Sequence, residues 1–389
     1  MKFQYFIPTK VLFGCGQLDM LHKQKLPGKR ALIVISNGTS VKKYGYLQRL
    51  EEQLDKANVS YAIFDKILPN PIETHVMEGA AFAKKEACDF VIGLGGGSII
   101  DAAKAIAVMA TNEGNIWDYI FGGTGGCKVP QVSPLPIVAI TTTAGTGTEA
   151  DPWAVVTHQD RNEKIGFGYD LTYPVLSIVD PELMLTVPEK LTAYQGFDAL
   201  FHSTEGYLNT VSSPINDMFT LKAIELIGKY LPIAVKDGKN VEARENVALA
   251  NTLSGMSEGI SGCISEHAME HPLTGHNPKL EHGAGLIMIC EAYYAYWAKS
   301  GVVNQRLIDM AIALGKKDAT KPEDFVTALH ELIVVCGVED LKMSDYGIKR
   351  DDLPMYTKAA YKTMGRLFER DPGELAFDDC LKIYENSYK

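Results

Sequence analysis

One aspartate and several histidines have the spacing of a metal site. Asp198 and His202 lie four residues apart, and so do His267 and His271. Residues four apart lie on the same face of a helix, so each pair can present two ligand atoms to one ion. His282 follows closely, which gives five candidates from two distant stretches of chain. A divalent metal needs only about four protein ligands, so the sequence predicts a metal site without deciding which candidates bind.

Residues next to the candidates help to decide which of the five bind the metal. Pro272 disfavours regular helix at the residue before it, so we expect His271 to diverge from the face of His267. Glu205 and Glu270 are interpreted as carboxylates that orient a ligand or pair with a lysine, because metal-bound imidazoles usually donate their second N–H to a nearby acceptor.

A glycine-rich loop is the main signal in the first half of the chain. Gly95, Gly96 and Gly97 follow an apolar run, and Ser98 opens a helical pattern. Without side chains in the way, a phosphate can approach backbone N–H groups and the positive end of the helix dipole. Ser98 occupies the last glycine position of a Gly-x-Gly-x-x-Gly motif, and no acid follows about 20 residues on, so a plain strand-to-helix turn stays open.

Two further loops favour a dinucleotide. The second combines glycines with hydroxyls at Thr142, Thr143 and Thr146, although a solvated turn is the alternative. The third, Ser36–Lys43, contains Gly38, Thr39, Ser40 and two lysines but no acid. A carboxylate there would bind a free ribose 2′-hydroxyl and repel a 2′-phosphate, so its absence favours NADP over NAD.

The elements that must position these residues change in kind near residue 186. Before it, apolar runs alternate with helical patterns, which predicts βαβ units and a mostly parallel sheet. After it, Thr186 and Glu189 resemble a capping box, and the pattern becomes helical. We expect an α/β dinucleotide-binding domain at 1–185 and an all-helical metal-binding and substrate domain at 186–389. The expected strands are Ala31–Ile35, Tyr61–Phe64, Phe90–Leu94, Pro136–Thr141 and Val175–Val179, with a hairpin at Trp153–Gly168; the expected helices include Tyr44–Asp55, Thr74–Lys84, Ile99–Met109, Val241–Met256 and starts near Ser213 and Lys321.

Composition excludes several classes of function. The formal charge of −10 argues against nucleic acid or an anionic membrane as the main partner. The opening residues lack a signal-peptide pattern, and we expect a cytoplasmic protein. The seven cysteines are scattered and form no Cys-x-x-Cys motif, and most of them are interpreted as buried small hydrophobes.

These motifs, taken in order, resemble iron-containing (group III) alcohol dehydrogenases, and the loop Ser36–Lys43 resembles the NADP-dependent butanol dehydrogenase and aldehyde reductase branch. The resemblance covers nearly the whole chain and is carried by Gly95-Gly-Gly-Ser-x-x-Asp-x-x-Lys104, Thr142-Thr-Ala-Gly-Thr-Gly-x-Glu149, Gly196-x-Asp198-x-x-x-His202, His267-x-x-x-His271-Pro and Glu281-His282-Gly283. It implies a dehydroquinate synthase-like architecture, a dimer or higher homo-oligomer, and hydride transfer between nicotinamide C4 and a metal-bound primary alcohol or aldehyde. The alternatives are a dehydroquinate synthase-like or glycerol dehydrogenase-like enzyme, or a catalytically silent nucleotide-binding protein.

The resemblance also implies roles for single residues. The metal ligands become Asp198, His202, His267 and His282, with Fe(II) expected and Zn(II) or Ni(II) as alternatives. His271 becomes the candidate proton relay, and His276, without a counterpart, is expected in a loop. The predicted cofactor residues for NADP, or for NAD as the alternative, are Gly38, Thr39, Ser40, Gly95, Gly96, Gly97, Ser98, Asp101, Thr142, Thr143, Thr146 and Lys164.

Overall fold

The computed structural model describes residues 2–389, which form two compact units. One unit comprises Ile7–Thr186, and the other comprises residues 2–6 together with Val187–Lys389. Met1, with which the predicted first domain begins, lies outside the described residues. No helix among residues 2–389 is long and apolar enough to cross a membrane.

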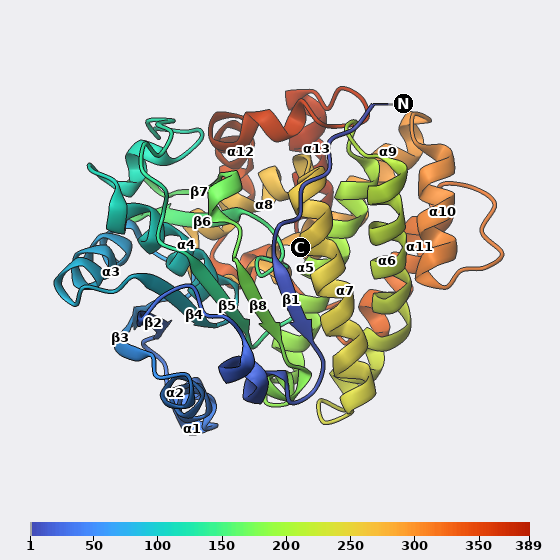
Figure 1. Ribbon diagram of the computed structural model, residues 1–389. Helices are drawn as coiled ribbons and strands as arrows, with labels where there is room; N and C mark the ends of the chain where they lie inside the picture. Colours follow the sequence, from blue (N-terminus) through green and yellow to red (C-terminus); the bar gives the residue numbers. More distant parts are fainter. Residues whose placement is uncertain (1) are drawn as a thin grey trace. The chain divides into compact units, whose positions relative to one another are not determined.

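The unit Ile7–Thr186 is built on a six-stranded parallel sheet with the strand order β1-β8-β5-β4-β2-β3 (Figure 1). A separate antiparallel hairpin, β6–β7, matches the hairpin expected at Trp153–Gly168. The strands are β1 (Lys10–Phe13), β2 (Arg30–Ser36), β3 (Ser60–Ile67), β4 (Phe90–Gly95), β5 (Ile137–Thr141), β6 (Trp153–His158), β7 (Glu163–Gly168) and β8 (Leu176–Val179), and the α-helices are α1 (Ser40–Lys43), α2 (Tyr46–Lys56), α3 (Glu73–Lys85) and α4 (Gly97–Thr111).

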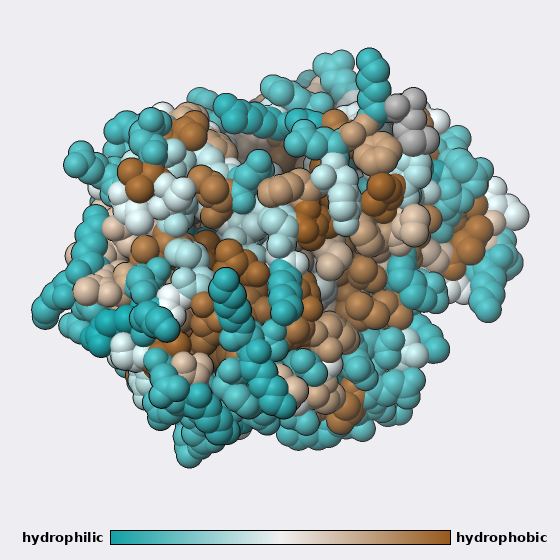
Figure 2. Space-filling view, in the orientation of Figure 1, coloured by the Kyte–Doolittle hydropathy of each residue, from teal (hydrophilic) through white to brown (hydrophobic). Residues whose placement is uncertain are grey.

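Periodicity explains the packing of this unit. Strands β4, β5 and β8 are buried along their whole length, as expected of parallel strands covered on both faces. Helix α2 buries Leu47, Leu50 and Leu54 on one side, and these leucines join a core cluster with β2, β4 and β5. Its outer side carries polar residues such as Glu52 and Asp55, and Figure 2 shows the hydrophilic surface over this helix at the lower left.

The unit that contains Val187–Lys389 is helical. Helix α5 is buried on almost every side, and α6, α7 and α9 pack against it (Figure 1). A helix in this position can carry polar residues only if other residues or a ligand satisfy them. The helices are α5 (Glu189–Leu208), α6 (Pro214–Lys236), α7 (Val241–Ile260), α8 (Ser265–His276), α9 (His282–Ser300), α10 (Asn304–Leu314), α11 (Glu323–Val335), α12 (Leu353–Phe368) and α13 (Phe377–Ser387).

The predicted fold class, an α/β domain with a parallel sheet followed by a helical domain, is confirmed, but two local predictions are wrong. Helix α5 begins at Glu189 with Pro188 at the N-cap, and the hydroxyl of Thr186 bonds to Tyr46 and caps no helix. Helix α8 continues through Pro272, so His271 keeps helical geometry. Proline removes one backbone hydrogen bond, and the close packing of α8 against α9 and α12 compensates for that loss.

Candidate functional site

Three imidazoles converge on one carboxylate oxygen in the helical unit. Oδ1 of Asp198 lies 3.6 Å from Nδ1 of His202, 3.5 Å from Nε2 of His267 and 3.6 Å from Nε2 of His282. Asp198 and His202 lie on α5, His267 lies on α8, and His282 begins α9. The structure therefore brings together the four predicted metal ligands from three helices.

The polar atoms at the centre of this group suit a cation. Within residues 2–389, neither Oδ1 of Asp198 nor Nε2 of His267 has a hydrogen-bond partner, although both are buried. Burying such atoms without a partner costs about 1–3 kcal/mol each, and a bound metal ion would remove that cost. The residues present therefore fit a divalent cation with one carboxylate and up to three imidazole ligands.

The pKa shifts of Asp198 and His202 agree with this reading; burial lowers the pKa of His267, but the charges of Cys263 and Glu205 raise it well above its ordinary value. Burial alone would raise the pKa of Asp198, but the charges of His202, His282 and His267 lower it below its ordinary value. Burial lowers the pKa of His202 against the opposing effect of Asp198. An ionised carboxylate beside a neutral imidazole is the state that a metal requires of these ligands.

Two buried glutamates hold the histidines from behind. Oε1 of Glu205 binds Nδ1 of His267, and Oε2 of Glu270 binds Nδ1 of His282. Each contact directs Nε2 of the same ring toward Asp198, which is the usual arrangement of a carboxylate behind a metal-bound histidine.

A close helix contact explains why glycine follows His282. A Cβ atom on Gly283 would lie 2.0 Å from the backbone oxygen of Tyr194 on α5. Only glycine permits α9 to begin this close to α5, and this approach brings His282 within reach of Asp198.

The other two histidines of α8 differ in their surroundings. The ring of His271 lies edge-on to His282, with centroids 5.4 Å apart, and 6.4 Å from the ring of His267. It therefore stays beside the metal site, contrary to the expected divergence. His276 is the last residue of α8 and not a loop residue, and its ring packs edge-on against Tyr356.

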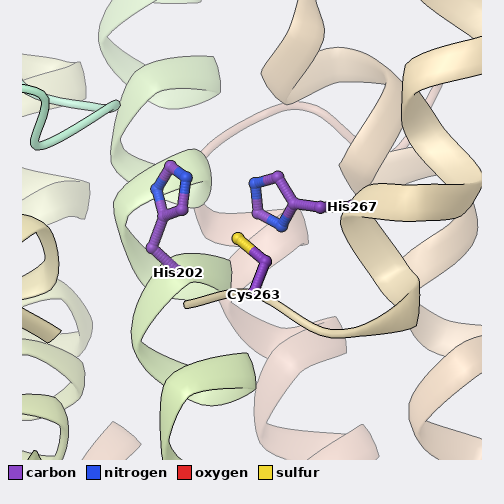
Figure 3. Close-up of side chains that lie close together, drawn as sticks. All are labelled: His202, Cys263 and His267. Carbon is purple, nitrogen blue, oxygen red and sulfur yellow. The ribbon is translucent and has the colours of Figure 1, made fainter. Parts of the chain in front are cut away.

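Sequence patterns did not identify Cys263 as part of this group. Its sulfur and one ring nitrogen each from His202 and His267 lie within 4.8 Å of one another (Figure 3). The cysteine precedes α8 and forms no recognised motif, so only the path of the chain between α7 and α8 reveals it.

The three predicted cofactor loops follow neighbouring strands of the other unit. Gly38 follows β2, Gly96 follows β4, and Thr142 follows β5, and these strands are adjacent and parallel. Their carboxyl ends share one edge of the sheet, where open α/β sheets usually bind ligands.

Two of these loops are in direct contact. A Cβ atom on Gly96 would lie 3.0 Å from the side chain of Thr143, and one on Gly97 would lie 2.4 Å from that of Thr146. Gly97 is the first residue of α4, so the threonines lie beside a helix N-terminus of the kind that binds phosphate. The hydroxyl of Ser98 instead accepts a hydrogen bond from the backbone of Asn70.

A buried lysine fixes the segment after the threonine loop. Nζ of Lys104 lies within 2.7–3.1 Å of oxygens on Thr148, Asp151 and Trp153. Asp101 accepts hydrogen bonds from Thr148 and from the backbone of Val155, so its carboxylate is engaged inside the protein. Lys164, on β7, is buried, and its charge acts on Asp101.

The loop after β2 is exposed and includes one ion pair. Gly38, Thr39 and Ser40 are solvent-accessible. Nζ of Lys42 lies 2.7 Å from Oδ2 of Asp65 on β3, so a carboxylate partly neutralises one of the two lysines expected to favour a 2′-phosphate.

Comparisons with known proteins agree on one family. Residues 8–181 match the iron-containing alcohol dehydrogenase family, and residues 192–388 match its C-terminal domain, described as Fe-containing alcohol dehydrogenase family, C-terminal. Alcohol dehydrogenase 4 of Schizosaccharomyces pombe is 36% identical over 92% of this chain and 83% of its own length. The NAD-dependent methanol dehydrogenase of Bacillus methanolicus is 32% identical over 98% of this chain and 99% of its own.

A solved structure extends the agreement to the fold. An archaeal halo-thermophilic Red Sea brine pool alcohol dehydrogenase superimposes with a TM-score of 0.93 at 33% identity, covering 100% of this chain and 99% of its own. Family match, sequence identity and fold agree over nearly the full length, and the chain therefore belongs to the iron-containing alcohol dehydrogenase family, as an oxidoreductase of the alcohol dehydrogenase class.

Proposed function

We propose that this protein is a metal-dependent, NAD(P)-linked dehydrogenase that interconverts primary alcohols and aldehydes. The observation that carries the proposal is the convergence of His202, His267 and His282 on Oδ1 of Asp198, within 3.6 Å. When a divalent cation is bound there, it supplies the Lewis acidity that favours loss of the alcohol proton and polarises an aldehyde carbonyl.

The residues around the metal ligands have separate tasks in this proposal. Glu205 and Glu270 fix the orientation of two imidazoles. His271, beside His282, receives the alcohol proton, since an imidazole titrates near neutral pH. In the other unit, the contacting loops of Gly96 and Thr143 would hold the cofactor pyrophosphate, and the nicotinamide, when bound, would donate or accept hydride at C4.

We further propose NADP as the preferred cofactor. The support is the loop after β2, where Gly38 leaves no carboxylate to repel a 2′-phosphate and Lys43 is exposed. The ion pair between Lys42 and Asp65 opposes this preference in part, and the NAD-dependent methanol dehydrogenase of Bacillus methanolicus shows that NAD is a real alternative within the family. For the metal we propose Fe(II), with Zn(II) as its competitor.

One assay tests the core of the proposal. The full chain is freed of metal, reloaded anaerobically with Fe(II) or Zn(II), and mixed with NADPH or NADH and a panel of short aldehydes, while the reduced-nicotinamide absorbance is followed. We expect metal-dependent oxidation that Asp198→Asn abolishes and Asp340→Asn, at an exposed position, leaves unchanged. Lack of oxidation with every aldehyde and both cofactors contradicts the proposal.

A further inference from the structure

A cysteine also lies beside two of the histidines that surround Asp198. The rings of His202 and His267 stack with centroids 4.4 Å apart. Asp198 lies beside both of them, and Cys263 also lies beside both, with its sulfur and one nitrogen from each ring within 4.8 Å of one another. Figure 3 shows the three side chains directed toward one another from α5, from α8 and from the segment between α7 and α8.

The segment that carries Cys263 is held in place. The side-chain nitrogen of Asn209, which directly follows α5, lies 2.8–3.4 Å from the backbone oxygens of Ser261, Gly262 and Cys263. The backbone N–H of Ile264 donates to Oε2 of Glu205. Glu205 and Asn209 lie at or just after the end of α5, the helix that carries His202. Their hydrogen bonds therefore fix the position of Cys263 relative to His202.

We propose that Cys263 is a metal ligand, and that with His202 and His267 it forms a two-nitrogen, one-sulfur set that holds a thiophilic divalent cation such as Zn(II) or Co(II). The inference rests on the proposed metal centre and adds to it a ligand that changes metal selectivity. Around a tetrahedral zinc ion, sulfur and nitrogen donors lie about 3.5 Å apart, so small side-chain rotations bring the three donors into place. The second observation is the buried Nε2 of His267, which has no hydrogen-bond partner among the described residues.

Binding of a metal ion by Cys263 requires the thiol to lose its proton and involves no redox step. The S–H bond breaks, a metal–sulfur bond forms, and the proton leaves to Oε2 of Glu258, which lies 3.2 Å from the sulfur and already accepts from the thiol. Thiolate ligands favour Zn(II) over cations that prefer oxygen, whereas a carboxylate with imidazoles discriminates less. Binding through the thiolate of Cys263 therefore favours cobalt and zinc, the proposed competitor of Fe(II) at this centre.

Cobalt gives a direct optical test. The full chain, freed of metal, is titrated with Co(II), and absorption is recorded in the near ultraviolet, where sulfur-to-cobalt charge transfer appears, and in the visible, where cobalt d–d bands appear. We expect both features in the wild type and in Cys290→Ser, which removes a buried thiol that donates to the backbone oxygen of Ile287. In Cys263→Ser the charge-transfer band should vanish, and zinc affinity should fall about tenfold or more.

The outcomes separate the inference from the proposed function. Cobalt d–d bands without charge transfer in the wild type overturn the role of Cys263 and leave the metal centre intact. Failure of the wild type to bind Co(II) at all overturns both. If Cys263→Ser does not fold, X-ray absorption of the zinc-loaded wild type decides alone: a sulfur scatterer about 2.3 Å from zinc supports the inference, and a shell of only nitrogen and oxygen overturns it.

Discussion

The carboxylate of Glu205 contacts His267 twice: Oε1 binds Nδ1 of the imidazole, and Oε2 lies 3.3 Å from the backbone nitrogen of the same residue. Glu205→Gln places an amide N–H₂ against at least one of these donors and lets the ring rotate. We expect metal affinity to fall about 10–100-fold. Calorimetric titration of the metal-free chain with Zn(II) measures this. Glu189→Gln, at an exposed position on α5, is the control, and equal affinities in both variants would contradict an orienting role.

The position of His271 predicts a catalytic effect that is separate from metal binding. Its ring lies edge-on beside that of His282, with centroids 5.4 Å apart, whereas Oδ1 of Asp198 lies within 3.6 Å of ring nitrogens of His202, His267 and His282. For His271→Ala we expect metal content to stay constant while kcat for alcohol oxidation falls about a hundredfold and its pH profile loses the limb that reports proton transfer. His276→Ala, on the same helix, should match the wild type. A wild-type rate and pH profile in His271→Ala would remove the relay role.

Lys104 should contribute to stability far more than a surface lysine. Its ammonium group is fully buried and contacts Thr148, Asp151 and Trp153, and burial raises the pKa of Asp151 to about 7 despite the opposing charge of Lys104. Lys104→Met keeps the volume but leaves these oxygens without their donor, and we expect a loss of about 3–5 kcal/mol in the free energy of unfolding.

The matched control is Lys128→Met, which breaks an exposed ion pair with Asp118 at 3.0 Å. That change should cost less than about 1 kcal/mol. Urea denaturation of the three proteins at one pH measures both values. Similar losses in the two variants would mean that the buried network has little net effect.

Only part of the metal site can be predicted from sequence patterns. The spacing of Asp198 and His202 predicts their shared helix face because local geometry alone sets it. Cys263 was missed because its contact with His202 depends on how α7 turns into α8, which no local pattern encodes. The path of α8 at His271 was misjudged for the opposite reason: the local preference against helix before Pro272 is real, but tertiary packing overrides it.

Cofactor choice should depend on the side chain at position 38. A Cβ atom on Gly38 would meet only Oγ of Ser36, at 3.3 Å, so a larger side chain can be accommodated. In Gly38→Asp, the new carboxylate repels the 2′-phosphate and can bind the ribose 2′-hydroxyl, and we expect kcat/KM for NADPH to fall about tenfold or more while that for NADH stays or rises. Gly38→Asn has the same shape without the charge and should change the preference much less. If the ratio of kcat/KM for NADPH to kcat/KM for NADH is the same in Gly38→Asp as in the wild type, the predicted location of the 2′-phosphate is contradicted.

Asp371 should make stability depend on pH. Burial raises its pKa from 3.8 to about 8, and it accepts a hydrogen bond from the backbone of Ser265. Between about pH 3.8 and pH 8, Asp371 is therefore protonated in the native state and ionised in the unfolded state. The proton on native Asp371 therefore contributes to the free energy of unfolding in full at low pH. This contribution is lost as pH rises, and the free energy of unfolding falls by at most about 1.4 kcal/mol per pH unit.

Asp371→Asn keeps the acceptor for Ser265 and removes the titration. We expect this variant to show a flatter dependence of unfolding free energy on pH between pH 5 and pH 8, roughly the range set by the native pKa. Denaturation with a chelator present isolates the effect from metal binding, and Asp340→Asn, at an exposed position, should behave as the wild type. Parallel curves for Asp371→Asn and the wild type would mean that Asp371 is already ionised in the native protein, because only a proton held in the native state can produce this slope.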